Sequence, residues 1–318
     1  MKRFSTILLA MAAVVVAAVS CNKEGNEPEG KMAVLSYEVN LSEVATKAFG
    51  DGSTVNRLAY SIYDNDTKYA SGVVEGSGSF NFKPSLYFGK EYDIVLFAYV
   101  DGAYDVADLT AVKKNAVYGE NADAFCLKQT ILIDKDETVI INGDDSNKSF
   151  RDGLSVVLKR PFAQLNIGTK PLEDLTKVGA AKVKVSISNY NAASYNVRTG
   201  SVNAAENTSV EYVYTIADIN DETFDITVGE GAAATTTTYN YVSLNYLFPV
   251  GTVNADVTVL KEDDTVIRTV EFKNLPLVAN QKTNIYGNLV KGELTFNVSL
   301  NNVFDKNEQD KDNEVEIK

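Results

Sequence analysis

Any chemistry in this chain would depend on carboxylates, hydroxyls and amines, because the sequence of 318 residues contains no histidine. This excludes the Ser-His-Asp and Cys-His nucleophile systems and the usual zinc sites. Paired carboxylates could still hydrolyse glycosides, which requires two acids about 5–9.5 Å apart. With 43 Asp and Glu residues, however, such pairs arise by chance. We therefore expect no catalytic residue, no cofactor and no enzymatic activity.

A calcium site is the second chemistry to consider. Asp305, Lys306 and Asn307, with Glu316 further along, have the spacing of an EF-hand loop, but Asp310 stands where that loop needs glycine. We expect a solvated acidic tail over residues 305–318 and no metal site.

Sugar binding is the third, because aromatic rings stack on sugars. Five tyrosines gather in the second half of the chain: Tyr190, Tyr195, Tyr239, Tyr241 and Tyr246. The chain has no tryptophan, and tyrosine is also a common strand residue. Core and sheet-edge positions are the expected role of these tyrosines, and a glycan platform is the alternative.

The charge balance limits the partners further. The formal net charge is −13 and the isoelectric point is about 4.6, which argues against nucleic acid, whose phosphates attract clustered lysine and arginine. Cys21 and Cys126 are the two cysteines of the sequence. If Cys21 is modified, no intramolecular disulfide can form.

The N-terminus has the pattern of an export signal. Lys2 and Arg3 precede an apolar run of about 13 residues, which is too short for a membrane span and typical of a signal-peptide core. Ala18-Val19-Ser20-Cys21 resembles the lipobox of bacterial lipoproteins, which implies a signal peptide over residues 1–20 and acyl chains on Cys21 that anchor the protein in the outer membrane. Residues 21–32 are mainly polar and predict a flexible leash. A plain secretory signal with an incidental cysteine is the alternative.

The elements that must position any site are mainly strands, because apolar residues alternate along most of the chain. The alternating positions include Leu35, Tyr37, Val39 and Leu41; Val183, Val185 and Ile187; and Leu294, Phe296, Val298 and Leu300. Residues 94–100 are apolar on both faces, which predicts a central strand. Short helices are expected near Pro171–Leu175 and within Asp105–Lys114, and a mobile loop at the threonine tract 235–238.

Many short strands separated by turn residues predict an all-β protein of antiparallel β-sandwiches. The length after signal removal favours two domains. Pro161 interrupts a strand-like run, so we place an N-terminal β-sandwich at residues 33–160 and a C-terminal β-sandwich at 161–304, followed by the charged tail.

Three segments resemble fimbrillin-like proteins. They are Val157-Leu158-Lys159-Arg160-Pro161-Phe162-Ala163-Gln164-Leu165-Asn166-Ile167-Gly168-Thr169, Leu275-Pro276-Leu277 with Asn280-Gln281-Lys282-Thr283-Asn284-Ile285-Tyr286-Gly287-Asn288-Leu289, and Tyr195-Asn196-Val197-Arg198-Thr199-Gly200. The resemblance implies two tandem transthyretin-like β-sandwiches and a structural or adhesive subunit of surface fimbriae. Its partners would be other fimbrial subunits.

In such subunits a protease removes an N-terminal strand, and a donor strand from the next subunit fills the vacated groove. The resemblance places the displaced strand at residues 33–41, with Leu35, Tyr37, Val39 and Leu41 facing inward. It places the cleavage at Lys47-Ala48, where the family has arginine in place of Lys47. An arginine-specific protease would not cut there, and Arg57 is the nearest alternative.

The candidate donor strand is residues 293–300, with Leu294, Phe296, Val298 and Leu300 as its apolar positions; an ordinary last strand of the second sandwich is the equal alternative. If no cleavage occurs, the expectation changes to a monomeric, lipid-anchored surface protein that binds a glycan or host ligand.

Overall fold

The computed structural model describes residues 30–41, 52–115, 119–142, 148–206, 209–219, 221–229, 233–291, 297–302 and 313–315. The chain divides into two units, Met1–Lys31 and Met32–Lys318. Cys21, Lys47, Ala48, Leu294 and Phe296 lie outside the described residues. All elements given below belong to the second unit.

The strands before residue 160 are β1 Met32–Val34, β2 Tyr37–Leu41, β3 Arg57–Asp64, β4 Thr67–Glu75, β5 Ser79–Phe82, β6 Ser85–Tyr87, β7 Lys90–Tyr99, β8 Tyr104–Asp105, β9 Lys113–Lys114, β10 Ala124–Ile133, β11 Thr138–Ile141, β12 Lys148–Ser149 and β13 Leu154–Leu158. The later strands are β14 Ala163–Thr169, β15 Lys182–Ser188, β16 Ser194–Asn196, β17 Ser201–Asn203, β18 Val210–Thr215, β19 Thr223–Val228, β20 Thr235–Leu247, β21 Gly251–Leu260, β22 Val266–Leu277, β23 Gln281–Gly287, β24 Asn297–Asn302 and β25 Asn313–Val315. The helical elements are α1 Glu173–Lys177 and the short 3₁₀ turns η1 Gly119–Ala122, η2 Phe150–Asp152 and η3 Ile216–Asp218.

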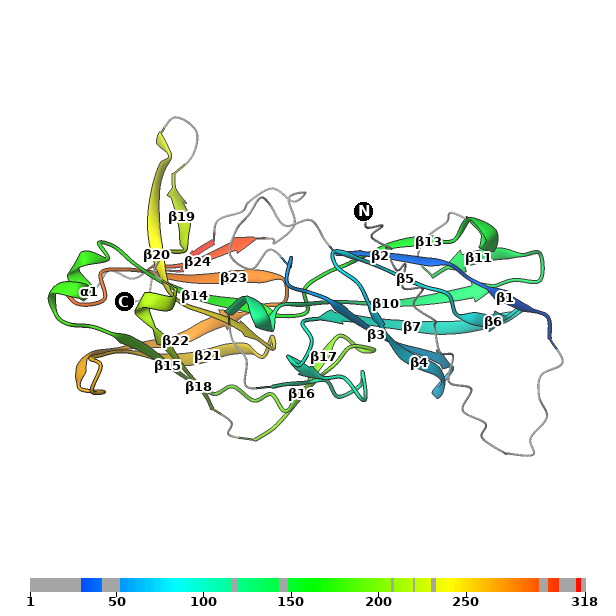
Figure 1. Cartoon of the computed structure of the whole chain (residues 1–318), viewed down its shortest axis with the longest axis horizontal. Coiled ribbons are helices and arrows are strands. Elements are labelled where there is room, and N and C mark those ends of the chain that lie inside the picture. The colour runs from blue at the N-terminus through cyan, green and yellow to red at the C-terminus, as the bar shows by residue number, and fades with distance from the viewer. Residues whose placement is uncertain are drawn as a thin grey trace, which may run out of the picture. The chain divides into compact units, whose positions relative to one another are not determined.

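The first half of this unit contains a six-stranded sheet, in the order β12-β11-β10-β7-β3-β4, and a three-stranded sheet, in the order β13-β2-β5 (Figure 1). Apolar side chains from both sheets, such as Tyr37, Phe80, Ile94 and Leu154, form one buried cluster. The two sheets therefore pack as a β-sandwich.

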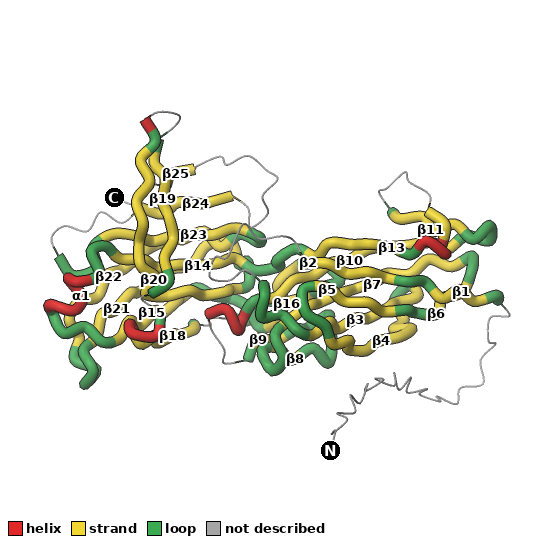
Figure 2. The backbone as a smooth tube through the Cα atoms, turned by 45° about the horizontal axis from the view of Figure 1, so that its top comes forward, coloured by secondary structure: helices red, strands yellow, loops and turns green. Residues whose placement is uncertain are grey.

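The second half repeats this plan with a six-stranded sheet, β19-β20-β14-β23-β24-β25, and a four-stranded sheet, β18-β15-β21-β22. Most strands are antiparallel, but β2 runs parallel to β13 and β14 runs parallel to β23. Beyond the sheet, β19 and the first residues of β20 continue as a two-stranded ribbon (Figures 1 and 2). The all-β class and the tandem sandwiches predicted from the sequence are confirmed.

The central strand predicted at residues 94–100 is β7, which lies between β10 and β3. Its side chains are apolar on both faces because each face packs in a different cluster: Ile94 and Leu96 contribute to the core of the first sandwich. Val95 and Phe97 contribute to a second cluster that continues through Phe162 into the second sandwich. The two halves thus share buried apolar surface, while the predicted boundary at Arg160-Pro161 falls in the short connection between β13 and β14.

Two local predictions are wrong and one is confirmed. Asp105–Lys114 forms strands and turns instead of a helix, since the Asp108 carboxylate accepts hydrogen bonds from the backbone and hydroxyl of Thr110 and closes a turn. The threonine tract is the start of β20, because β-branched side chains suit a strand; Thr238 donates to Asp225 across the ribbon. The short helix near Pro171 is α1.

Candidate functional site

The candidate displaced strand, β2, is the middle strand of the three-stranded sheet. It pairs antiparallel with β5, with Tyr37 opposite Phe82 and Val39 opposite Phe80. On its other side it pairs parallel with β13, where Tyr37 lies opposite Leu154. Removal of β2 would therefore leave two separated strand edges. We call the space between them, floored by the core of the first sandwich, the β2 slot.

The side chains of β2 alternate as the sequence predicts. Leu35 and Val39 are fully buried and Tyr37 is 1% exposed, whereas Leu41 is half-buried. Glu38 points to solvent between them. The predicted strand is interrupted, however, because β1 ends at Val34 and pairs separately with β6. One continuous apolar row nevertheless enters the core.

The ring of Tyr37 packs well in the slot, but its hydroxyl has no hydrogen-bond partner there. Its ring stacks on Phe82 with centroids 4.8 Å apart, and Phe82 stacks in turn on Tyr60 at 4.9 Å. The hydroxyl is buried and has no hydrogen-bond partner in the described part of the chain. Burial raises the pKa of Tyr37, so the hydroxyl stays protonated and needs an acceptor that the slot does not supply.

The entrance of the slot is closed by backbone contacts. Leu35 N–H donates to the Pro84 carbonyl at 3.0 Å, and Leu154 N–H donates to the Ser36 carbonyl at 2.8 Å. Gly153 has φ +72°, and a Cβ atom there would lie 2.9 Å from the Ser36 oxygen. Glycine is therefore required where β13 begins beside the chain that enters β2.

Of the two basic residues considered for cleavage, only Arg57 lies in the described residues. It is the first residue of β3, its side chain is 25% exposed, and it forms ion pairs with Glu75 and, at 3.0 Å, with Asp101. A protease needs an extended backbone whose hydrogen-bonding groups are accessible, whereas Arg57 is paired in the ladder with Glu75 on one side and Tyr99 on the other. The geometry favours a cut elsewhere than Arg57.

The candidate donor strand overlaps β24. Its backbone pairs antiparallel with β23, with Val298 opposite Ile285 and Leu300 opposite Thr283, and also with β25. In its described part, residues 297–300, the segment belongs to a strand of the second sandwich, which is the alternative prediction from the sequence. A donor role requires that it leave this position.

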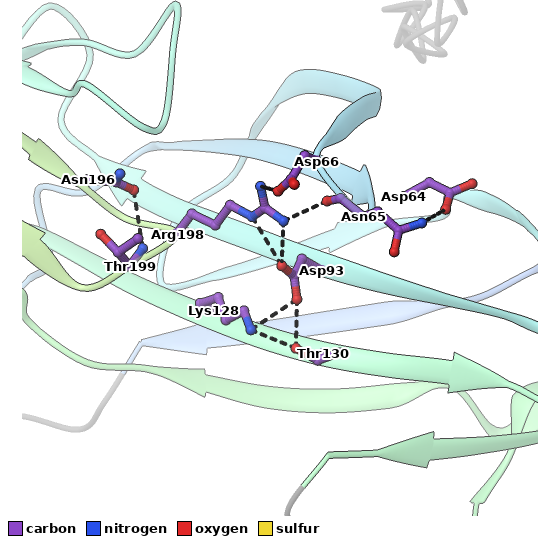
Figure 3. A network of polar contacts seen from close by, with 9 residues as sticks. All are labelled: Asp64, Asn65, Asp66, Asp93, Lys128, Thr130, Asn196, Arg198 and Thr199. Atoms are coloured by element: carbon purple, nitrogen blue, oxygen red, sulfur yellow. Dashed lines mark hydrogen bonds and ion pairs between the residues drawn. The ribbon is translucent and has the colours of Figure 1, made fainter.

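A network of polar side chains joins the two halves, shown in Figure 3. Arg198, from the turn after β16, donates to the Asp93 carboxylate on β7 at 3.0 Å and to Asp66 at 3.1 Å. Its guanidinium also lies over the Tyr63 ring, 4.5 Å from the centroid. Lys128 pairs with Asp93 from the opposite side at 3.0 Å. One carboxylate thus holds two cations from different elements.

This environment sets the charge of Asp93. Burial alone would raise the pKa of Asp93, but hydrogen bonds from Thr130, Lys128 and Arg198 outweigh it and lower the pKa. The same turn is held by backbone bonds between Tyr195 and Val112 at 2.8 and 2.9 Å. The segment 195–200, which carries one of the fimbrillin-like motifs, therefore fastens the second half to the first.

A second ion pair lies in the connection between the halves. The Arg160 guanidinium donates to both carboxylate oxygens of Asp123 at 2.8 and 2.6 Å, and both side chains are fully buried. The guanidinium also stacks over Phe125 at 4.3 Å. Burial raises the pKa of Asp123, and the charge of Arg160 opposes that rise. The pair holds the point at which β13 leads into β14.

The five tyrosines considered for sugar binding do not form an exposed platform. Tyr190, Tyr195, Tyr241 and Tyr246 are at most 6% exposed and belong to the core cluster of the second half, whereas Tyr239 is half-buried. Within the described residues, no group of three or more His, Cys, Asp or Glu side chains could hold a metal ion. No helix in the same residues is long and apolar enough to cross a membrane.

Sequence reasoning did not identify the partners of Arg160 or Arg198. Asp93 and Arg198 are 105 positions apart, so no local spacing connects them. The available signal was a carboxylate within the apolar central strand, since a buried charge requires a partner. Asp93, in β7 beside the apolar run 94–100, shows that pattern.

A family model matches residues 26–318, and its description is a family of unknown function, DUF6562. The chain belongs to this DUF6562 family. The matched region includes β2, both sandwiches and the C-terminal strands. No curated protein matches the sequence significantly.

Solved structures similar to this DUF6562 member come from species of Bacteroides, Parabacteroides and Porphyromonas. One is a proposed cell adhesion protein from Bacteroides uniformis, with TM-score 0.45, 15% identity, and coverage of 85% of this chain and 98% of that chain. Another is a fimbrial assembly protein from Parabacteroides distasonis, with TM-score 0.45, 12% identity, and coverage of 89% and 100%. A third is the C-terminally truncated tip fimbrial protein Mfa3 from Porphyromonas gingivalis, with TM-score 0.42, 12% identity, and coverage of 84% and 99%.

Proposed function

We propose that this protein is a bacterial surface subunit, structural or adhesive in role, that assembles by exchanging β2 for a strand of another subunit. The observation that carries the proposal is the place of β2 between β5 and β13. A strand in that position satisfies backbone groups on both sides and closes an apolar core. Its loss leaves a groove that only another strand can fill.

The segments around β2 agree with such an assembly. The lipobox-like Cys21 would attach the immature chain to the outer membrane through acyl chains, and cleavage after Lys47 would separate β2 from β3. The fimbrillin-like motifs of the sequence support the same assembly. The proposed donor is the segment that carries Leu294, Phe296, Val298 and Leu300.

The first test uses the chain from Asn22 to Lys318, treated with a protease that cuts after lysine and arginine and run unheated on an SDS gel. We expect a ladder of multimers whose new N-terminus is Ala48. The variant Lys47→Gln is the matched control and should remain monomeric under the same treatment. A trimmed wild-type chain that stays monomeric would contradict the proposal.

The second test removes the proposed donor. A chain that ends at Glu293 should lose polymerisation, while the first sandwich keeps its folded signature in near-ultraviolet circular dichroism, because none of that sandwich lies after residue 293. Multimers that persist after this truncation would exclude the C-terminal segment as the donor.

A further inference from the structure

One atom of β2 is poorly accommodated in the β2 slot, namely the hydroxyl oxygen of Tyr37. The Tyr37 side chain is 1% exposed, and its hydroxyl has no partner among the described residues. A buried hydroxyl without a hydrogen bond weakens its state by about 5- to 150-fold in an equilibrium constant. The ring itself is well placed, stacked on Phe82.

The other inward positions of β2 show what the slot accepts. Leu35 and Val39 are fully buried among apolar side chains of the first sandwich core. An occupant that kept these residues and replaced the tyrosine by phenylalanine would preserve the stacking and remove the unpaired hydroxyl. The slot therefore favours the pattern Leu-x-Phe-x-Val over the Leu-x-Tyr-x-Val of β2.

This chain contains the favoured pattern near its C-terminus. Residues 35–41 read Leu-Ser-Tyr-Glu-Val-Asn-Leu, and residues 294–300 read Leu-Thr-Phe-Asn-Val-Ser-Leu. Three of the four inward residues are identical in the two segments, and the fourth differs only in that Phe296 stands at the position of Tyr37. The outward positions stay polar, and Asn297 replaces the charge of Glu38.

The same segment is able to form a strand, because β24 pairs through its backbone with β23. Within one molecule β2 already fills the slot, so the segment must come from a second copy. Entry in the direction of β2, antiparallel to β5 and parallel to β13, places each inward residue of the segment at the position of its counterpart in β2.

We propose that the unpaired Tyr37 hydroxyl makes β2 the weaker of two possible occupants of the slot, so that the proposed donor, residues 294–300 of a second copy of this chain, displaces it. The inference rests on the proposed strand exchange and its proposed donor, and it adds the reason why the donor strand displaces β2. Tyr37 is thus a residue that promotes release of the N-terminal strand, and Phe296 is the residue that makes the replacement stable.

The experiment measures the entry of fluorescent peptides into protease-cut protein by anisotropy. Peptides spanning residues 292–302 are compared in the natural form and with Phe296→Tyr, on wild-type protein and on the Tyr37→Phe variant. The natural peptide should displace β2 from the wild-type protein about 5- to 150-fold more effectively than the tyrosine peptide. Tyr37→Phe should reduce displacement by a similar factor.

Tyr69→Phe is the matched control, because the Tyr69 hydroxyl lies in the same half and donates to the Ser85 carbonyl at 3.0 Å. It should leave displacement unchanged. If both peptides enter equally, the role of Tyr37 and Phe296 is overturned while strand exchange stands. If neither peptide enters cut protein, the proposed exchange fails, and this inference fails with it.

Discussion

β2 and β14 occupy equivalent places in their sheets, yet they differ in how completely they are buried. Each lies between an antiparallel and a parallel neighbour: β5 and β13 for β2, β20 and β23 for β14. Every residue of β14 is buried, whereas β2 has one exposed or half-exposed face. Pairing geometry alone therefore does not distinguish the two strands, whereas burial does: removal of β2 would expose one buried face, and removal of β14 would expose two.

The two strands also differ in their polar contacts. On β14, Asn166 donates to Asn284 of β23 at 2.7 Å, within the buried interior. On β2, Asn40 reaches Ser155 of β13 at 3.3 Å in an exposed position. A buried hydrogen bond is costly to break, and an exposed one is readily replaced by water. This difference adds to the asymmetry between the strands.

The largest expected effect concerns the start of β14. Arg160→Ala should destabilise the protein by about 3–5 kcal/mol, because it leaves the buried Asp123 carboxylate without its partner. Chemical denaturation of the uncut chain measures this. The double variant Arg160→Met/Asp123→Leu is the control and should recover most of the loss. An exposed Asp123 would instead give an effect below about 1 kcal/mol.

Leucine deletions on the two strands test the comparison directly. Leu165→Ala on β14 and Leu35→Ala before β2 both empty a fully buried site, so each should cost about 2–5 kcal/mol. Only Leu35→Ala should speed proteolysis at Lys47. After the cut and the release of residues 22–47, the protein that remains should have the melting temperature of cut wild-type protein. Equal acceleration in both variants would show that β2 leaves only on global unfolding.

Arg198→Ala should cost about 1–2 kcal/mol, since the lost hydrogen bonds are charged but half-exposed. The loss should shrink at high salt, because partly exposed ion pairs are screened. The double-mutant cycle with Asp93→Asn measures the coupling. Arg151→Ala, which removes an exposed pair with Glu137, is the control and should change stability little. A coupling near zero would exclude Arg198 as the fastening between halves.

A further expected effect is a pH dependence of stability, which arises from Lys114 on β9 and Lys282 on β23. Burial lowers the pKa of Lys114 to about 7 and that of Lys282 to about 8, from the ordinary 10.5. Between these values the unfolded chain binds more protons than the folded one, so stability should rise as the pH increases from 7 towards 10. Each of the two lysines should contribute at most about 1.4 kcal/mol per pH unit to this slope.

Calorimetry at pH 7, 8 and 9 checks this expectation. The variant Lys114→Met/Lys282→Met should show a flatter profile over that range, and the exposed substitution Lys177→Met should not. Lys282 pairs in register with Gln164 on β14, so the effect tests the surroundings of β14 in particular. An unchanged slope in the double variant would assign the dependence to other groups.

The alternation of Leu35, Tyr37 and Val39 predicts the buried face of β2 correctly, because a strand has a period of two. The sequence does not predict the parallel pairing with β13, since residues 37 and 154 are brought together by the whole fold. Likewise, the sequence favours core positions for the tyrosine cluster and leaves a glycan platform as the alternative, and only the packing of the second half buries four of the five. Local patterns specify strands and faces, whereas long-range pairing specifies the slot.

The connection between β13 and β14 has a mechanical consequence. The slot borders β13, and residues 159–162 lead from β13 directly into β14, the middle of the second half. Tension applied to a strand held in the slot would shear its hydrogen bonds with β13 together, and the force would continue along the same backbone into β14. The buried Arg160 lies on this path, so a chain of such subunits would bear load along the backbone that leads from β13 through Arg160 into β14.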